Sequence, residues 1–244
     1  MDFAVYVREA EIEATHWWFV GRRKLIADEL TAAGIGPQCR ALDVGTGTGS
    51  NLRLLRELKF REAEGVDSSE TAVRFCRQHG YGPMHHADIC DLPFAEAQFD
   101  LVLATDVIEH VDDDAKAVAE LLRVLKPGGL ALVTVPAFQM LWGRSDEIGQ
   151  HKRRYRLASL RALLESAGFR IEKIYYFNYL LFPVILTVRR AMGLLKLRIE
   201  TENDLNSPLL NRLLGGIFSL DVRTAPIVRP PFGVSILAAC RRVT

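Results

Sequence analysis

The sequence predicts a doubly wound α/β fold built on a mostly parallel sheet. Short apolar segments such as residues 99–104 alternate with amphipathic segments such as residues 113–125, at the spacing of βαβ units. The apolar segments show no strict alternation, which is typical of parallel strands that are buried on both faces. The expected strands are residues 41–44, 63–66, 84–87, 99–104, 130–135, 170–176 and 234–240.

Helix signals occupy the intervals between these strands. Ser68 or Ser69 can cap a helix over residues 69–79, because a serine hydroxyl accepts a hydrogen bond from an unpaired N–H of the first turn. The Pro-Gly-Gly sequence at residues 127–129 ends the helix over residues 113–125. The expected helices are residues 10–33, 51–58, 69–79, 113–125 and 158–167.

Length and composition are those of a soluble globular domain. A chain of 244 residues suits one α/β domain with additions, and 49% apolar and 25% charged residues are ordinary values. The N-terminus lacks the basic segment and apolar run of a signal peptide. No C-x-x-C pair is present, so we expect reduced thiols in a cytoplasmic protein, with no disulfide and no metal site. The cysteines are Cys39, Cys76, Cys90 and Cys240.

Charge is distributed unevenly along the chain. Residues 1–143 carry 14 basic and 22 acidic residues, a balance of −8, and residues 144–244 carry 17 and 8, a balance of +9. The basic C-terminal part predicts an anionic substrate or an anionic membrane surface as its partner. The alternative is an uneven solvated face without a partner.

Residues 42–50 (Leu-Asp-Val-Gly-Thr-Gly-Thr-Gly-Ser) are the most informative segment. A strand end breaks here into a turn that contains Gly45, Gly47 and Gly49, and a helix follows. Glycine lets the backbone approach a ligand closely, and the helix start offers unpaired N–H groups. A dinucleotide fingerprint requires glycine where this chain has Ser50, so the pattern differs from that of NAD-binding loops.

Acidic residues stand at the predicted carboxyl ends of four strands. Parallel sheets bind ligands at this edge, so these side chains are expected to meet around one site. A helix cap or a turn acid is the alternative reading of each residue taken singly. The residues are Asp43, Asp67, Asp88 and the pair Thr105-Asp106.

Five segments, in order and at family spacing, resemble the class I S-adenosylmethionine-dependent methyltransferases, and within them the small-molecule branch. The segments are residues 42–50, 65–69, 87–94, 99–111 and 122–129. The resemblance implies a Rossmann-like sheet of seven strands, one of them antiparallel, with an N-terminal helix and a helical insertion before the last strand. It also implies one domain, with a helical lid at residues 1–37, a core at 38–176 plus 232–244, and the insertion at 177–231.

The resemblance further implies S-adenosyl-L-methionine as the cofactor and assigns residues to it. Asp67 would accept from both ribose hydroxyls, and Asp88 with Ile89 would flank the adenine. The glycine loop and Asp43 would meet the methionine part. The full expected set is Asp43, Gly45, Thr46, Gly47, Gly49, Asp67, Ser68, Asp88, Ile89, Thr105, Trp18 and Arg22.

Three adjacent aromatic residues, at positions 17–19, cannot all face one helical core stripe, so at least one is expected at a ligand or lid surface. In related enzymes an N-terminal helix closes over the cofactor, which implies contacts from Trp18 and Arg22. Core packing with a surface cation–π pair is the alternative.

Residues 177–230 interrupt the alternation of strands and helices. The first twelve are mostly apolar, which is too few to span a bilayer, and Arg189, Arg190, Lys196 and Arg198 follow. Three readings stay open: a cap over the site, an interfacial element on a membrane, or a helical pair packed on the domain.

Methyl transfer requires a nucleophile held in line with the methyl group, and histidine is the best base near pH 7 for a hydroxyl nucleophile. The candidate catalytic residues are His151, His110 and Asp106, and His16 is less favoured. A structural role is the alternative for His110.

A basic loop follows His151. Arg153, Arg154 and Arg156, beside Tyr155, could grip a phosphate or carboxylate. The loop and the insertion together predict an acceptor with anionic and apolar parts, such as a lipid-linked or polyketide-like molecule.

The expected function is methyl transfer to a small-molecule or lipid-like acceptor, with oxygen favoured over nitrogen and carbon. Alternatives are an NAD-dependent oxidoreductase, opposed by Ser50 and the absence of Tyr-x-x-x-Lys, and a non-catalytic or membrane-associated protein of the same fold. Nucleic acid is not expected as a substrate, because the Pro-Pro-Phe at residues 230–232 lies too late for the motif of amino-methylating enzymes. The protein is expected in the cytoplasm, free or at the inner face of the membrane.

Overall fold

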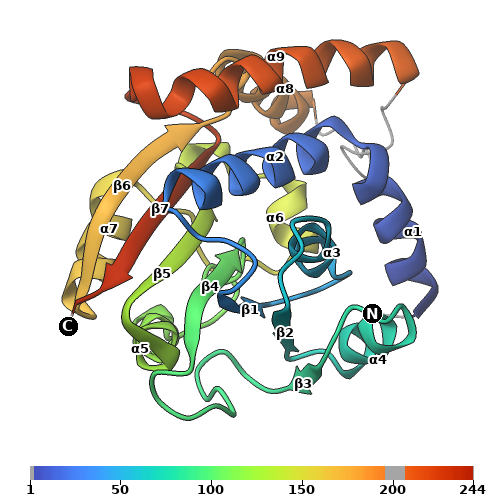
Figure 1. Ribbon diagram of the computed structural model, residues 1–244. Helices are drawn as coiled ribbons and strands as arrows, with labels where there is room; N and C mark the ends of the chain where they lie inside the picture. Colours follow the sequence, from blue (N-terminus) through green and yellow to red (C-terminus); the bar gives the residue numbers. More distant parts are fainter. Residues whose placement is uncertain (1–2, 196–206, 244) are drawn as a thin grey trace.

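The computed structural model describes residues 3–195 and 207–243 and shows a seven-stranded sheet with the order β3-β2-β1-β4-β5-β7-β6 (Figure 1). Strand β7 is antiparallel to both of its neighbours, and all other pairs are parallel. The predicted fold class is therefore confirmed. The strands are β1 Arg40–Val44, β2 Glu62–Asp67, β3 Met84–His86, β4 Phe99–Thr105, β5 Leu125–Pro136, β6 Phe169–Phe177 and β7 Ser235–Arg242.

Helices cover both faces of the sheet. One face packs against α5 (Asp114–Val124) and α7 (Leu157–Ser166). The other packs against α2 (Trp17–Ala32), α3 (Ser50–Glu57), α4 (Glu70–Gln78) and α9 (Pro208–Val228). The four cysteines are free thiols, as expected.

The N-terminal segment forms two helices where one was predicted over residues 10–33. Helix α1 (Phe3–Thr15) and helix α2 (Trp17–Ala32) meet at His16, whose backbone is extended. The His16 Nδ1 accepts a hydrogen bond from Trp18 N and so caps α2. Asn211, far along the chain, accepts from Trp17 N at 2.8 Å and donates to Thr15 O at 2.9 Å. The break is therefore stabilised by a contact that the local sequence does not reveal.

The predicted insertion contains α8 (Phe182–Leu195) and α9 (Pro208–Val228), with Lys196 and Arg198 outside the described residues. Helix α9 lies beside α2 (Figure 1). A Cβ on Gly21 of α2 would lie 2.2 Å from Phe218 Cδ1, so only glycine allows this close approach. Asp221 of α9, fully buried, accepts from the backbone N–H groups of Asn178 and Leu180.

Two short elements complete the described fold, a 3-10 turn (Gln139–Leu141) and α6 (Arg144–Ile148), both between β5 and α7. They lead into the loop that carries His151. None of the helices that the structure describes has the length and apolar content to cross a bilayer.

Candidate functional site

The glycine loop between β1 and α3 leaves its backbone open at the carboxyl edge of the sheet. Gly45 and Gly47 have left-handed backbone angles, with φ of 70° and 55°. A Cβ on Gly45 would lie 2.4 Å from Val107 Cγ2, whereas a Cβ on Gly47 would meet no atom within 4 Å. Packing therefore requires glycine at position 45, while Gly47 borders open space from which a ligand can reach the backbone.

Asp67 ends β2 and fixes this loop. Its Oδ2 accepts from Gly47 N at 2.8 Å, and its Oδ1 accepts from Ser69 N at 2.8 Å. Ser69 in turn caps α4, as predicted, by accepting from Ala72 N. Each carboxylate oxygen has a further lone pair, so Asp67 can accept from a ligand hydroxyl without leaving the loop.

Asp43 is fully buried beneath the glycine loop. Its Oδ1 accepts from Asn51 Nδ2 at 2.8 Å, and the same amide donates to Thr105 Oγ1 at 2.9 Å. Among the described residues, no donor reaches Asp43 Oδ2. Burial raises the pKa of Asp43 to about 7. A buried oxygen without a donor costs free energy, so a cationic or N–H group brought by a ligand would stabilise it.

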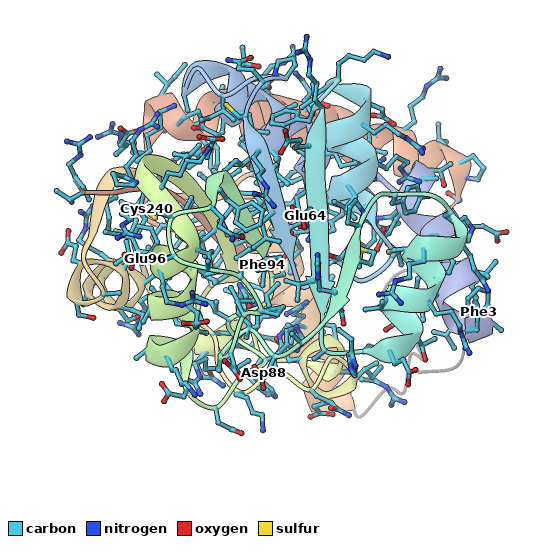
Figure 2. All side chains as sticks on the ribbon, turned by 60° about the horizontal axis from the view of Figure 1, so that its bottom comes forward. Phe3, Glu64, Asp88, Phe94, Glu96 and Cys240 are labelled. Carbon is cyan, nitrogen blue, oxygen red and sulfur yellow. The ribbon has the colours of Figure 1, made fainter. Side chains whose placement is uncertain are left out.

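The predicted adenine side follows β3. Asp88 lies exposed in this loop (Figure 2), and its Oδ1 accepts from Cys90 N at 2.8 Å. Ile89 beside it is buried, at 7% exposed, and Ser68 at the end of β2 is exposed. The structure thus brings an exposed acid and an apolar side chain to one edge. Thr46 ties the loop together by donating to Asp43 O.

Helix α2 brings Trp18 and Arg22 to the other side of the loop. Arg22 Nη1 pairs with Asp106 Oδ2 at 2.5 Å, and Asp106 itself has a left-handed backbone with φ of 56°. Such a conformation in a non-glycine residue is costly and concentrates at functional sites. Trp18 stacks on Phe177 and Phe218, with ring centroids 5.8 Å and 5.1 Å away. Trp18 therefore packs in the core and also lines the pocket described next, and its contact with the cofactor stays a prediction.

A pocket of about 550 Å³ lies between α2, the ends of β4 and β5, and helices α8 and α9. Charged and polar groups reach it from Arg22, Asp106, Glu109, His151 and Arg154. The remaining lining is mainly apolar and includes Trp18, Leu181, Val184, Ile185, Val188 and Leu214. The insertion thus forms a wall of the pocket, while Asp67 and Asp88 lie outside it.

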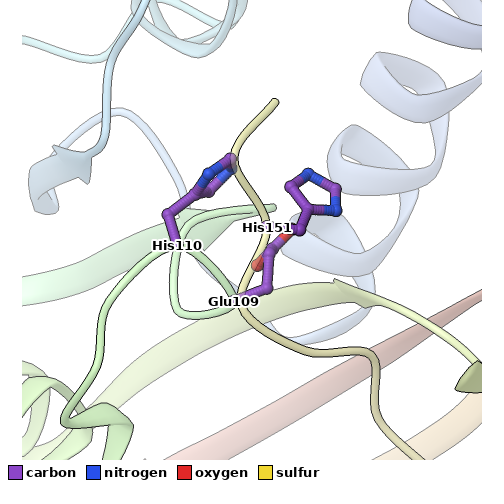
Figure 3. A group of neighbouring side chains, drawn as sticks. All are labelled: Glu109, His110 and His151. Atoms are coloured by element: carbon purple, nitrogen blue, oxygen red, sulfur yellow. The ribbon is translucent and has the colours of Figure 1, made fainter. Parts of the chain in front are cut away.

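Four residues near the end of β4 and in the loop after α6 form what we call the polar cluster: Asp106, Glu109, His110 and His151. Glu109 is fully buried, and the rings of His110 and His151 are 4.6 Å apart (Figure 3). Burial raises the pKa of Glu109 well above its usual range, and the negative charge of Asp106 adds to this effect. Burial, with the neighbouring His151, lowers the pKa of His110, so this ring is neutral at pH 7.

Asp146 of α6, fully buried, organises the loop that carries His151. It accepts from His151 Nδ1 at 2.8 Å and from Arg154 Nε and Nη2 at 2.7 and 2.9 Å. Although burial opposes ionisation, the hydrogen bonds from His151 and Arg154 lower the pKa of Asp146 to about 2. Neither Asp146 nor Glu109 was predicted as a site residue from the sequence. For Glu109, its position next to the candidate His110 was a usable signal, whereas Asp146 had none.

Arg153 and Arg154, two of the three arginines predicted to bind an anion, have partners within the protein, and anion binding by this loop stays a prediction. Arg154 is 4% exposed and spans Asp146 and the backbone carbonyl of Ala137. Arg153 pairs with Asp114 at 2.8 Å and donates to the backbone carbonyls of residues 111 and 112. Arg156 is exposed and begins α7.

Comparison with known proteins shows a similarity to methyltransferases. Residues 42–133 match the sequence profile described as "Methyltransferase domain". A protein of Mycolicibacterium smegmatis named "Probable S-adenosylmethionine-dependent methyltransferase" is 32% identical over 160 residues, which are 64% of this chain and 61% of that protein. The chain is therefore similar to S-adenosylmethionine-dependent methyltransferases, and residues 42–133 match a methyltransferase domain. The name of this relative gives S-adenosylmethionine as the cofactor of that protein.

Two further similarities concern part of the chain and the fold. The malonyl-[acyl-carrier protein] O-methyltransferase of Enterobacter lignolyticus is 35% identical over 115 residues, covering 44% of this chain and 45% of that enzyme. A chain from the complex between the Haloferax volcanii Trm112 methyltransferase activator and a methyltransferase superposes with a TM-score of 0.65 at 20% identity, covering 99% of this chain and 95% of that one. This likeness shows the shared fold. The chain spans about six-tenths of the length of the mycobacterial relatives that it matches.

The structural role of Arg154 predicts a large loss of stability when it is replaced. Arg154→Met should lower the free energy of unfolding by about 3–5 kcal/mol, because it leaves Asp146 buried without its main counter-charge. Arg156→Met, at an exposed neighbouring position, should change it by less than about 0.5 kcal/mol. Urea unfolding measures both variants. If both substitutions changed the free energy of unfolding by the same small amount, the Arg154–Asp146 pair would not be what stabilises the loop.

Proposed function

We propose that this protein transfers the methyl group of S-adenosylmethionine to an oxygen atom of an acceptor with an apolar body. The observation that carries the proposal is the pocket, which has mainly apolar walls and meets the polar cluster at the carboxyl edge of the sheet. When bound, the cofactor supplies a methyl group on a positively charged sulfur. The partial match to an O-methyltransferase supports oxygen as the acceptor atom.

The residues of the glycine loop side fit the cofactor. Asp67 is placed to accept from ribose hydroxyls, and open space beside Gly47 lets a ligand approach the backbone. The donorless oxygen of Asp43 suits the amino group of the methionine part. The remaining residues that we assign to the cofactor on this side are Gly45, Thr46, Gly49, Ser68, Asp88, Ile89 and Thr105.

Helix α2 contributes Trp18 and Arg22 to the lining of the acceptor pocket. Arg22 neutralises Asp106 at the end of β4, and Trp18 packs between the pocket and the aromatic rings of Phe177 and Phe218. We assign Trp18 and Arg22 to the border between cofactor and acceptor. Their rigid contacts limit the positions that an acceptor can take relative to the cofactor.

The polar cluster supplies the groups that act on the acceptor oxygen. His151 and Asp106 line the pocket, and His110 lies behind them against the His151 ring. The Asp146 carboxylate fixes the His151 ring through Nδ1, so Nε2 is available for the acceptor side. We propose that His151, His110 and Asp106 orient the acceptor hydroxyl or carboxyl group and favour its ionised form.

The apolar walls predict a dependence of methyl transfer on alkyl chain length. For a series of hydroxylated or carboxylated amphiphiles, kcat/KM should rise about fourfold for each added methylene until the pocket is filled, since burial of each contributes about 0.8 kcal/mol. The measurement is transfer of label from methyl-labelled S-adenosylmethionine. Ile185→Trp should narrow the pocket and so shorten the alkyl chain that gives the highest kcat/KM. Val5→Trp on α1, away from the pocket, should leave this chain length unchanged. Rates independent of chain length would contradict the assignment of the pocket.

We further propose that α9 lies on an anionic membrane surface, from which a lipid-like acceptor reaches the pocket. Four large apolar side chains recur at helical spacing along one face of α9, and all are strongly exposed, at 56–81%. Arg212 and Arg223 are exposed beside them. An amphipathic helix with this pattern binds membrane interfaces. The four are Leu209, Leu213, Leu220 and Ile227.

The membrane proposal predicts flotation with vesicles of anionic lipid at low salt. Replacing Leu213 and Leu220 together by serine should release the protein from the vesicles, because it removes the centre of the exposed stripe. Replacing Val5 and Val7, which are exposed on α1, by serine should leave flotation unchanged. A wild-type protein that stays below the vesicles would contradict the proposal.

A further inference from the structure

The carboxylate of Glu109 has no partner in the part of the chain that the structure describes. The side chain is fully buried, and neither Oε1 nor Oε2 has a hydrogen-bond donor. Removing a carboxylate from water without compensation is among the costliest arrangements in a fold. The nearby Arg22 is already paired with Asp106, and Arg154 with Asp146. A buried group of this kind requires either a proton or a cation.

Two histidines converge on this carboxylate. Glu109 and His110 stand in the loop after β4, and His151 reaches them from the loop after α6 (Figure 3). One potential ligand atom of each residue lies within 4.8 Å of those of the other two. Within residues 3–195 and 207–243, no other group of three histidine, cysteine or acidic side chains is gathered this closely.

The surroundings prepare both histidines to act as ligands. His151 bonds through Nδ1 to the buried Asp146 carboxylate, so Nε2 is the ring nitrogen that can meet a metal ion. A carboxylate behind an imidazole in this way fixes the ring and makes its other nitrogen a better donor to a metal ion. The backbone carbonyls of Asp106 and Gly149 lie beside the His110 ring and can accept the N–H that a bound imidazole retains.

We propose that Glu109, His110 and His151 form a binding site for one divalent first-row transition metal ion. Two imidazole nitrogens and one carboxylate oxygen favour Zn²⁺, Mn²⁺, Fe²⁺ or Co²⁺ over Mg²⁺ and Ca²⁺, which prefer oxygen ligands. Three protein ligands leave coordination positions open, as in catalytic sites. The sequence led to no expectation of a metal site, because two of the ligands are adjacent and the third lies 41 positions later, outside any common ligand spacing.

The site has a role in methyl transfer that rests on the proposed function. Glu109 and His151 line the acceptor pocket, so an ion between them can bind an acceptor oxygen. Bound hydroxyl groups ionise more readily, and the proton leaves to water. The acceptor oxygen then forms a bond to the methyl carbon of the cofactor, the carbon–sulfur bond breaks, and its electron pair stays on sulfur as a neutral thioether. The two histidines thus act as ligands, which refines the roles proposed for them above.

Titration with Co²⁺ tests the site without any methyl transfer. The purified protein is treated with a chelator, dialysed and titrated with Co²⁺ while its visible absorption is recorded, and Zn²⁺ is then added as a competitor. We expect one Co²⁺ per chain, an absorption spectrum of low-coordinate cobalt with nitrogen ligands, and its loss on addition of Zn²⁺. The absence of stoichiometric binding by the folded wild-type protein would overturn the proposal.

Substitutions at the proposed ligands test where the metal ion binds. Glu109→Gln keeps the size of the side chain and removes its charge, and it should weaken Co²⁺ binding at least tenfold, as should His151→Ala. His79→Gln changes an exposed histidine on the other side of the sheet and should leave binding unchanged. Urea unfolding shows whether each variant is folded, and His110→Ala serves as a second test if Glu109→Gln is not. Unchanged binding in folded Glu109→Gln and His110→Ala would place the metal elsewhere and refute the site.

Different results would contradict the metal site and the proposed function. A protein that binds Co²⁺ at Glu109 but transfers no methyl group to any amphiphile supports the metal site and contradicts the proposed function. A protein that transfers methyl groups at full rate after chelation, and binds no Co²⁺, contradicts the metal site alone.

Discussion

The packing of α9 onto α2 is the contact on which the rest of the site depends. Phe218 fills the space that Gly21 leaves, Asn211 bonds the backbone on both sides of the break at His16, and Asp221 holds the start of the insertion. These contacts set the direction of α2 and therefore the positions of Trp18 and Arg22. The same contacts leave a pocket between the helices and the sheet edge. A segment inserted before the last strand thus shapes both the placement of α2 and the pocket.

The site has two parts, the glycine loop and the pocket, and a buried acidic residue lies beneath each. Asp43, beneath the glycine loop, and Glu109, beneath the pocket, each keep oxygen atoms without a donor among the described residues, and burial raises the pKa of both. Asp106, which follows β4, has a left-handed backbone conformation and is paired with Arg22. Arrangements of this kind destabilise the empty protein and are compensated by bound cationic groups. The cofactor would compensate Asp43, and the proposed metal ion would compensate Glu109.

Local chemistry made much of the fold predictable. The apolar strands, the Ser69 cap and the glycine loop follow from short-range rules, and the structure confirms them. The break at His16 was not predictable, because its stabilising partner Asn211 lies almost 200 residues away. The pairing of Arg154 with Asp146 was not predictable for a similar reason, since the sequence did not show that Asp146 is buried. The chain alone could not show that Glu109 lacks a donor, because this property depends on everything packed around it.

The most direct test of this account is calorimetric titration with S-adenosylhomocysteine. We expect micromolar binding by the wild-type protein, no binding of NAD, and affinity reduced at least tenfold by Asp67→Ala, because this carboxylate holds the glycine loop at Gly47 and faces the cofactor side. Asp28→Ala, which removes an exposed acid of α2, is the matched control and should bind like the wild type. Equal affinity in Asp67→Ala, or binding of NAD instead, would contradict the assignment of the glycine loop to the methyl donor.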